Sequence, residues 1–413
     1  MQDLFEKCRG DGGYFGALRA AKDMYFSQPV LDSLPGPHMN FHGRPVIMWS
    51  VNSYLGLAGN ERIKAAALSS VKENSISHPM GSRLLTGNTT KHRELEAALA
   101  DYCIKPAAIV FNYGYLGVIG TISAMVGPFD DVIIDKLSHA SMLDGAMLAM
   151  RGRKFRPFKH NDLNSLERQL KAAAKNEKGG TLVIVEGVYG MRGDLADLRG
   201  ICELKDKYGA KLFVDDAHGF GVMGPNGRGT GDHFGVQDKI DLYFGTFAKT
   251  FAAIGGVTAA APEVVDYIRY NARSNVFAKA LPMVYVDGVH ATLKEILAHP
   301  EYRERMWHIA GLLQSGLREL GYNIGDTGSP ITPVYVPTGE PQTGMQIMQT
   351  LRDKYGIFLS GVTYPVTPRG IHLYRMIPTA AHTEEDVQTT LTAFKEIRDQ
   401  MGLVRSQGWA QAV

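Results

Sequence analysis

Short apolar runs that alternate with amphipathic helical segments constrain the fold of this chain most. Between about residues 60 and 270 these runs are too short for helices and do not alternate between apolar and polar residues. Strands that are apolar on both faces are typical of parallel sheets covered by helices on both sides. The sequence therefore predicts an α/β domain with a mostly parallel sheet. Its strands are expected at 107–111, 132–134, 182–185, 212–214 and 242–244.

The 413 residues are too many for one small core, so more than one domain is expected. We predict an N-terminal segment, a large domain, a smaller C-terminal α+β domain and a frayed tail. Their boundaries are 1–45, 46–285, 286–403 and 404–413. In the small domain, residues 285–320 read as one long helix broken near Pro300, and a last helix is expected from Glu384 to Met401.

Composition and charge narrow the class of function. The formal net charge is only +2 and the sequence has no dense Lys/Arg stripe, which argues against a nucleic-acid partner. Cys8, Cys103 and Cys202 are far apart and lack metal-ligand spacing, so we expect no metal, no disulfide framework and a cytoplasmic location. The sequence shows neither a secretory signal nor an apolar run of spanning length. Peripheral membrane contact stays open, because a soluble enzyme can accept a lipid-like acyl group.

Polar side chains stand directly after two of the expected strands, where ligands of open α/β sheets bind. Lys249 lies in a turn of small residues after 242–244, where desolvation would make its amine nucleophilic. Asp215 ends the run at 212–214, where a carboxylate can pair with a pyridinium nitrogen, and His218 can reach the same ring. The alternative is an exposed helical lysine and a helix-capping aspartate beside a solvated histidine.

Three further positions add weaker signals. Gly114 and Tyr115 start a helical segment whose backbone N–H groups can meet a phosphate. His139 can stack on a flat ring, although a lone histidine is more often structural. Arg375 offers a fork for a carboxylate, or a surface ion pair. The order of glycine turn, His, Asp-x-x-His, Lys and late Arg is the order found in fold-type I enzymes that use pyridoxal phosphate (PLP).

The chain resembles the α-oxoamine synthases, the family of serine palmitoyltransferase, glycine C-acetyltransferase, 8-amino-7-oxononanoate synthase and 5-aminolevulinate synthase. It looks most similar to bacterial serine palmitoyltransferases through YNARS at 270–274 and AHT at 381–383. The resemblance extends over about residues 40–400 and implies a fold-type I large domain with a seven-stranded sheet. Its motifs are NSYLGL at 52–57, GSRLLTG at 81–87, HRELE at 92–96, SHAS at 138–141, HND at 160–162, VDDAH at 214–218 and GTFAK at 245–249.

This resemblance assigns roles around the cofactor ring. Lys249 would carry PLP as a Schiff base and act as the base that removes the α-proton. Asp215 would pair with the pyridine nitrogen and His218 with the phenolic oxygen, while His139 would stack on the ring.

The resemblance also assigns the two anionic ends. Gly114, Tyr115 and Thr246 would hold the phosphate, and Asn52 and Arg375 would contact the carboxylate of the amino acid. The family builds its sites at a homodimer interface, so a homodimer is expected in which 278–282 faces the cofactor of the partner.

Departures from the family pattern remove hydroxyl groups and add cations. Gly190 and Ala248 stand where serines are usual, Arg192 replaces an acid, and Lys279 lies in a stretch that is usually rich in Ser and Thr. One interpretation is that Lys279 replaces hydroxyls at the phosphate. Another is that the cations Arg192 and Lys279 recognise an anionic amino acid such as cysteate, and a third is that both are solvated.

The expected reaction joins a small amino acid, serine or an anionic analogue such as cysteate, to a long-chain acyl thioester with loss of CO₂. Its product would be a 3-keto sphingoid-type or sulfonolipid precursor. The acyl carrier, acyl-CoA or acyl-ACP, and the acyl length stay open. Two alternatives are kept: a glycine or alanine C-acyltransferase, such as 8-amino-7-oxononanoate synthase or glycine C-acetyltransferase, and a non-catalytic subunit of a heteromeric synthase.

Overall fold

The chain forms two compact units in the computed structural model, which describes residues 3–150, 155–336, 340–364 and 366–402. The sheet unit comprises Asn52–Gly190 and Asp194–Arg303, and the second unit comprises the residues up to Val51, Met191–Gly193 and the residues from Glu304 onward. This division differs from the boundaries predicted at 45 and 285. The predicted tail at 404–413 lies outside the described residues.

Strand and helix pairing explain the difference. In the second unit, strand β3 pairs with β12 from the far end of the chain, so the N-terminal segment joins the C-terminal residues. In the sheet unit, helix α11 packs along α2 and α3, which keeps 286–303 with the large sheet.

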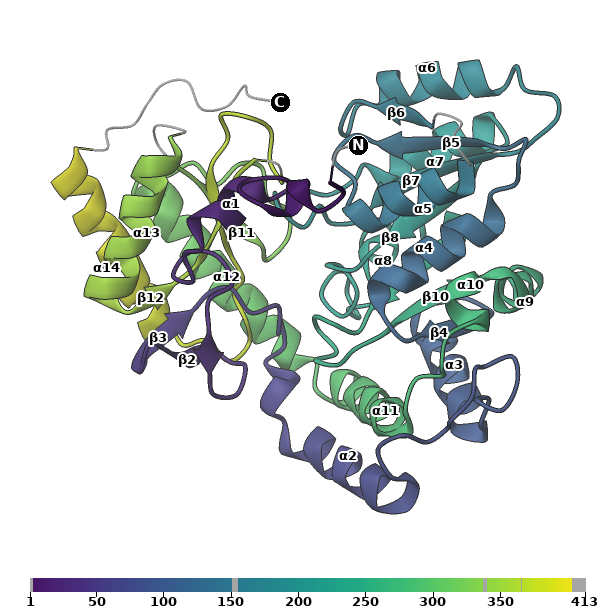
Figure 1. The fold of residues 1–413 in the computed structure, drawn as a ribbon, viewed down its shortest axis with the longest axis horizontal. Coiled ribbons are helices and arrows are strands. Elements are labelled where there is room, and N and C mark those ends of the chain that lie inside the picture. The colour runs from purple at the N-terminus through teal and green to yellow at the C-terminus, as the bar shows by residue number, and fades with distance from the viewer. Residues whose placement is uncertain (1–2, 151–154, 337–339, 365, 403–413) are drawn as a thin grey trace. The chain divides into compact units, whose positions relative to one another are not determined.

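The sheet unit is built on seven strands, as Figure 1 shows, in the order β4-β10-β9-β8-β7-β5-β6. Neighbours from β6 to β9 run parallel, and only β10 runs antiparallel to both of its neighbours. The mostly parallel seven-stranded sheet is confirmed. Its strands are β4 (Ala107–Phe111), β5 (Asp131–Asp135), β6 (Arg156–Phe158), β7 (Thr181–Glu186), β8 (Lys211–Asp215), β9 (Leu242–Thr246) and β10 (Gly256–Ala260).

The helices of this unit cover the sheet and connect its strands. Asp162 caps α6 by accepting the N–H of Ser165, and Thr89 caps α3 in the same way through His92. The helices are α2 (Glu61–Asn74), α3 (Thr90–Tyr102), α4 (Gly114–Met125), α5 (Ala140–Met150), α6 (Leu163–Ala173), α7 (Leu198–Lys207), α8 (Thr230–Phe234), α9 (Pro262–Asn271), α10 (Arg273–Val276) and α11 (Met283–Ala298).

The second unit has two small sheets. One has the order β1-β2-β3-β12 and the other the order β11-β14-β13. Its strands are β1 (Leu31–Asp32), β2 (His38–Phe41), β3 (Arg44–Met48), β11 (Thr332–Tyr335), β12 (Ile357–Phe358), β13 (Ser360–Val362) and β14 (Leu373–Met376). Its helices are α1 (Gly16–Ala21), α12 (Glu301–Glu319), α13 (Pro341–Tyr355) and α14 (Glu384–Met401). The break between α11 and α12 at Pro300 and the last helix from Glu384 to Met401 are confirmed.

A buried ion network ties four segments of the sheet unit together. Glu96 on α3 accepts hydrogen bonds from Arg83 and Arg269 and from the backbone N–H of Val110 on β4. The Glu96 and Arg83 side chains are only 5% and 3% exposed. Removing one member therefore leaves a buried charge without its partner.

We predict that Glu96→Ala lowers the free energy of unfolding by about 3–5 kcal/mol, because Arg83 would stay buried without its carboxylate. Chemical denaturation of the purified variant measures this change. Lys64→Ala is the matched control, since the Lys64–Glu61 pair is solvent-exposed and such pairs contribute about 0–1 kcal/mol. Equal losses in the two variants would contradict the prediction.

Candidate active site

Two buried carboxylates lie side by side at the carboxyl ends of β7 and β8. Glu186 and Asp215 are register partners across these parallel strands, and both are buried. The backbone N–H of Ala217 donates to Asp215 Oδ1 at 3.1 Å. Burial raises the pKa of Asp215, and the charges of Lys249 and His139 oppose that rise. Burial, with the nearby Asp215 adding to it, raises the pKa of Glu186 to about 8.

Lys249 stands in a tight turn that follows β9. The Lys249 carbonyl accepts the N–H of Ala252, and the turn closes where Phe247 N–H donates to the carbonyl of Gly255. Gly255 has a φ of 111°, a conformation that side chains rarely adopt. The positive charge of Lys249 opposes the rise in the pKa of both Asp215 and Glu186. The structure thus brings the predicted lysine and carboxylate together at one edge of the sheet.

The first turn of α4 packs against the same lysine turn. A Cβ atom at Gly114 would lie 2.6 Å from Thr246 Oγ1, so only glycine permits this approach. The Thr246 hydroxyl itself donates to the Gly255 carbonyl at 3.2 Å. No side chain caps the first-turn N–H groups of α4 among the described residues. These N–H groups beside a hydroxyl form a donor set that suits a phosphate.

Tyr115 contributes its backbone rather than its side chain to this donor set. Its ring is half exposed, and its hydroxyl donates to Asp144 on the neighbouring helix α5. That hydrogen bond raises the pKa of Tyr115.

Two histidines are fixed at the edge of the sheet by different partners. The backbone N–H of His139 donates to Glu186 Oε1 at 2.8 Å, and its ring Nδ1 pairs with Ser141 Oγ at 2.8 Å. His218 Nδ1 pairs with the buried Tyr54 hydroxyl at 2.8 Å. Both rings are therefore oriented by protein groups before any ligand arrives.

Gly190 has a second explanation beyond the loss of a hydroxyl. A Cβ atom at Gly190 would lie 2.4 Å from His218 Nε2, so a side chain there would move the imidazole. The Gly190 N–H also donates to Glu186 Oε2 at 3.2 Å. The missing side chain thus lets this backbone lie directly against His218.

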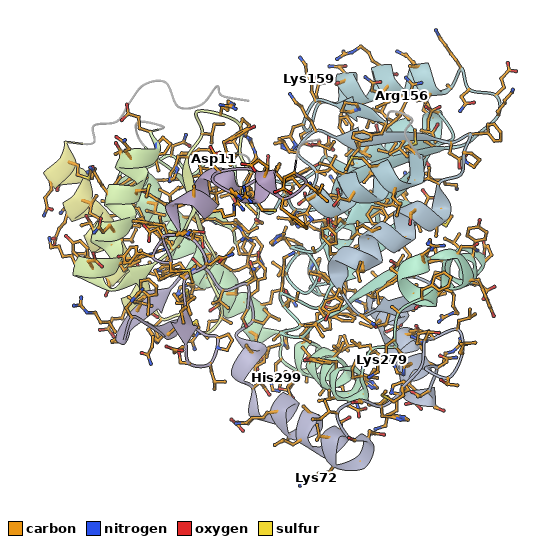
Figure 2. All side chains as sticks on the ribbon, viewed as in Figure 1. Asp11, Lys72, Arg156, Lys159, Lys279 and His299 are labelled. Atoms are coloured by element: carbon orange, nitrogen blue, oxygen red, sulfur yellow. The ribbon has the colours of Figure 1, made fainter. Side chains whose placement is uncertain are left out.

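Lys279 is anchored through its backbone, and its side chain is exposed. Residue 279 forms an isolated bridge with Ser82, and its carbonyl accepts the side-chain N–H of Asn112, which directly follows β4. Lys279 lies shortly before α11 (Figure 2). Its backbone is therefore held beside Ser82 and Asn112, and its side chain is accessible to solvent.

The residues predicted to bind the amino-acid substrate fall in both units. Asn52 is half-buried, two residues before the Tyr54 that holds His218. Arg375 lies on β14 and Arg192 within Met191–Gly193, and both belong to the second unit. The roles of Asn52, Arg375 and Arg192 stay predictions.

Comparison with known proteins decides the family. The family model for class I and II aminotransferases matches residues 44–394. The chain belongs to this aminotransferase family. It is 44% identical over 404 residues to a cysteate-C-fatty acyltransferase of Capnocytophaga ochracea, covering 97% of this chain and 96% of that protein. It is 36% identical over 381 residues to an 8-amino-7-oxononanoate synthase of Alkaliphilus metalliredigens, covering 92% and 95%.

Solved structures agree with this placement. A serine palmitoyltransferase from S. paucimobilis with bound PLP–myriocin aldimine matches with a TM-score of 0.89 and 30% identity, covering 98% of this chain and all of that one. The resemblance to α-oxoamine synthases and the fold-type I architecture are thereby confirmed.

Sequence reasoning missed several polar groups of this aminotransferase-family site. Glu186 was not among the predicted site residues, although its place at the end of an apolar run is the same signal that singled out Asp215. The hydroxyls of Ser138 and Thr250 are buried without a hydrogen-bond partner among the described residues, and each is next to a site residue in sequence. Nothing in the sequence distinguishes these hydroxyls from other buried ones.

We predict that Gly114→Ala weakens binding of a phosphate-bearing cofactor by roughly tenfold or more, because its Cβ would displace Thr246 and remove about one charge-assisted hydrogen bond. Fluorescence titration of the apoprotein with the cofactor measures the affinity. The control is Gly288→Ala, since Gly288 is also helical and its Cβ would meet nothing within 4 Å. An unchanged affinity in Gly114→Ala would contradict the assignment of the α4 start as the phosphate-binding site.

Proposed function

We propose that this protein is a PLP-dependent acyltransferase that joins a small amino acid to a long-chain acyl thioester, with release of CO₂. The observation that carries the proposal is half-buried Lys249 next to the buried Asp215 and Glu186, beside the glycine-opened start of α4. A cysteate-C-fatty acyltransferase at 44% identity supports cysteate as the amino acid. The thioester would be acyl-CoA or acyl-ACP, and the product would be a sulfonolipid precursor.

The residues present fit PLP at each of its functional groups. Asp215 offers a buried carboxylate for the pyridine nitrogen, and the α4 start with Thr246 offers donors for the phosphate. Lys249 would hold the cofactor covalently. The unpartnered Ser138 and Thr250 hydroxyls, counted among the described residues, are further donors next to these groups. The set expected to bind the cofactor is Gly114, Tyr115, His139, Asp215, His218, Thr246 and Lys249; Lys279 would join it only if its ammonium group replaced hydroxyls at the phosphate.

When bound, PLP supplies an electron sink for the electron pair left by the α-proton. Lys249 would remove that proton, because its amine is freed when the amino acid takes its place. Asp215 would keep a proton on the ring nitrogen through its negative charge. His218 and His139 would orient the ring edge and face. A new carbon–carbon bond to the acyl carbon would expel the thiolate, which takes a proton from solvent. CO₂ would then leave, and Lys249 would return its proton to the α-carbon.

Recognition of the amino acid is proposed to use a separate set of groups. Asn52 and Arg375 would contact its carboxylate. Arg192 and Lys279 would supply positive charge for a sulfonate. A cation replaces an expected acid at position 192. This change of sign favours an amino acid with an anionic side chain over one with a neutral side chain.

We predict that L-cysteate shifts the visible absorption band of the PLP-loaded protein at lower concentration than L-serine, glycine or L-alanine. Arg192→Gln and Lys279→Ala should each raise the apparent dissociation constant for cysteate by about tenfold, as expected for a lost charge-assisted contact. Spectrophotometric titration measures both effects. Their affinity for L-alanine serves as the internal control and should not change.

Three outcomes would revise the substrate. A selective response to serine would make Arg192 and Lys279 bystanders and indicate a serine palmitoyltransferase. A response to glycine or alanine alone would indicate another α-oxoamine synthase. A purified protein that never develops a visible band with added PLP would support a non-catalytic subunit.

We predict that Lys249→Ala reduces turnover by on the order of 1,000-fold, because both the covalent attachment and the proton transfer depend on this amine. Product formation from acyl thioester and amino acid, followed by mass spectrometry, measures turnover. Lys72→Ala on α2 removes another lysine of the sheet unit and should retain activity. Normal turnover in Lys249→Ala would overturn the assignment.

A homodimer with shared active sites is part of the proposal. Large apolar side chains are exposed in segments that lie close together, including Leu85 at 78% and Phe277 at 75%. The bridge between Ser82 and Lys279 and the bond from Asn112 to Lys279 gather these segments. A second copy of the chain would cover them, and Phe277→Glu should shift the mass measured by light scattering toward the monomer.

A cytoplasmic location is also proposed. Its support is that Cys8, Cys103 and Cys202 are free cysteines. Within the part of the chain that the structure describes, no helix combines the length and apolarity needed to span a bilayer.

A further inference from the structure

The HND motif at 160–162 has no part in the chemistry described so far. Two of its residues, His160 and Asn161, connect the segment after β6 to other segments of the sheet edge. Asp162 caps α6. Asn161, at a φ of 53°, donates to the Leu195 carbonyl at 2.7 Å and accepts the Asp197 N–H at 3.0 Å. His160 makes the most buried of these contacts.

His160 bridges two carboxylates through its two ring nitrogens. Nδ1 lies 3.0 Å from Asp135 Oδ1, and Nε2 lies 2.8 Å from Asp194 Oδ2. The side chains of His160, Asp135 and Asp194 are 6%, 1% and 15% exposed. A neutral imidazole can donate only one hydrogen bond, whereas an imidazolium donates two. The geometry therefore requires the charged form.

The electrostatics agree with this protonation state. Burial alone would lower the pKa of His160, but the hydrogen bonds to Asp135 and Asp194 outweigh it and raise the pKa to about 9. The groups that face the ring are Asp135 at the end of β5, Asp194 after β7, and Tyr189, whose ring meets it edge-on at 4.4 Å. The Tyr189 hydroxyl also bonds Asp135.

We call His160 with Asp135 and Asp194 the His160 clamp. Its Asp135 side is connected to His139. Asp135 Oδ1 accepts the Leu137 N–H at 2.8 Å, and the Ser138 N–H donates to the Asp135 carbonyl. The next residue, His139, is held by Glu186 through its own backbone N–H. The position of Asp135 thus fixes the short turn that presents the His139 ring.

The Asp194 side of the His160 clamp is connected to His218. The Asp194 carbonyl accepts the Tyr189 N–H at 3.0 Å, and Ala196 N–H donates to the Gly187 carbonyl at 3.1 Å. These bonds fix the stretch that carries Gly190, whose backbone lies against the His218 ring. A movement of Asp194 would therefore change the orientation of the His218 ring.

We infer that His160 is a positioning residue whose imidazolium, by holding Asp135 and Asp194, sets the orientation of His139 and His218 around the cofactor. This inference rests on the proposed function, because the two histidines act only if they face PLP. His160 itself touches neither histidine and acts through the turns that carry them.

The test replaces His160 with glutamine, which is neutral. In the PLP-loaded protein, His160→Gln should shift the position or pH dependence of the visible band and lower kcat by on the order of 10- to 100-fold, with KM for the acyl thioester little changed. His308→Gln is the matched control, because His308 pairs with Glu384 at 2.8 Å on an exposed surface. An unchanged band, pH profile and kcat in His160→Gln would overturn the positioning role.

A second measurement uses the protein without PLP. The folded pKa of His160, about 9, lies above its unfolded value of about 6.5, so its stabilisation is complete below about pH 6.5 and is lost as pH rises through about 9. The Tm difference between wild type and His160→Gln should therefore shrink between these values. A difference that is constant with pH would overturn the charged clamp.

Two outcomes separate this inference from the proposed function. A wild-type protein that shows no band with PLP refutes the proposed function and the positioning role together. A normal wild type beside an unaltered variant refutes only the positioning role. If His160→Gln does not fold, Asp194→Asn removes one carboxylate and keeps the His160–Asp135 bond, and the same changes in band and pH profile are expected in it.

Discussion

The burial of two carboxylates on neighbouring parallel strands is the constraint on which the rest of the site depends. Glu186 and Asp215 cannot move apart without breaking the register of β7 and β8. Charging both acids at a buried edge costs free energy, which raises the pKa of each, and backbone N–H groups and a cation partly offset this cost. The N–H groups come from His139, Gly190 and Ala217, and the cation is Lys249. The loops that carry the chemistry are thus placed by the electrostatic needs of these two acids.

The site residues come from distant parts of the sequence. This arrangement explains why they nevertheless need to move little when a ligand binds. A parallel sheet is covered on both faces, so its carboxyl edge is where polar side chains can gather. Two of the turns there are tied down by a hydrogen bond to a buried acid: the turn before α5 by Asp135, and the turn at Gly190 by Glu186. A flat, anionic cofactor would complete a set of donors that is already fixed, which lowers the entropic cost of binding it.

The sequence predicted most of this fold because its strands carry strong patterns, and it failed where the pattern is weak. Unbroken runs of large apolar residues marked β5, β7 and β8. In contrast, β10 is mostly Gly, Ala and Thr with a single Val, and β6 contains a proline, so neither β10 nor β6 gave a signal. The carboxylate was found because it directly follows an apolar run, and the lysine because it lies in a turn of small residues after one. Glu186, the contact of Gly190 with His218 and the clamp at His160 were missed because each depends on which loops meet across the sheet edge.

Burial and hydrogen bonding also separate the residues that stabilise the site from those that can determine its substrate specificity. A change at Glu186 or His160 alters buried hydrogen bonds, so it must disturb several loops at once. Lys279 differs because its backbone is fixed through Ser82 and Asn112 while its charged end is exposed. A surface charge contributes little to stability, and it can strongly change the affinity for an anion. A chain with this scaffold can therefore exchange hydroxyls for cations at 279 and leave the cofactor site in place, which is the change expected when a neutral amino-acid substrate gives way to a sulfonate.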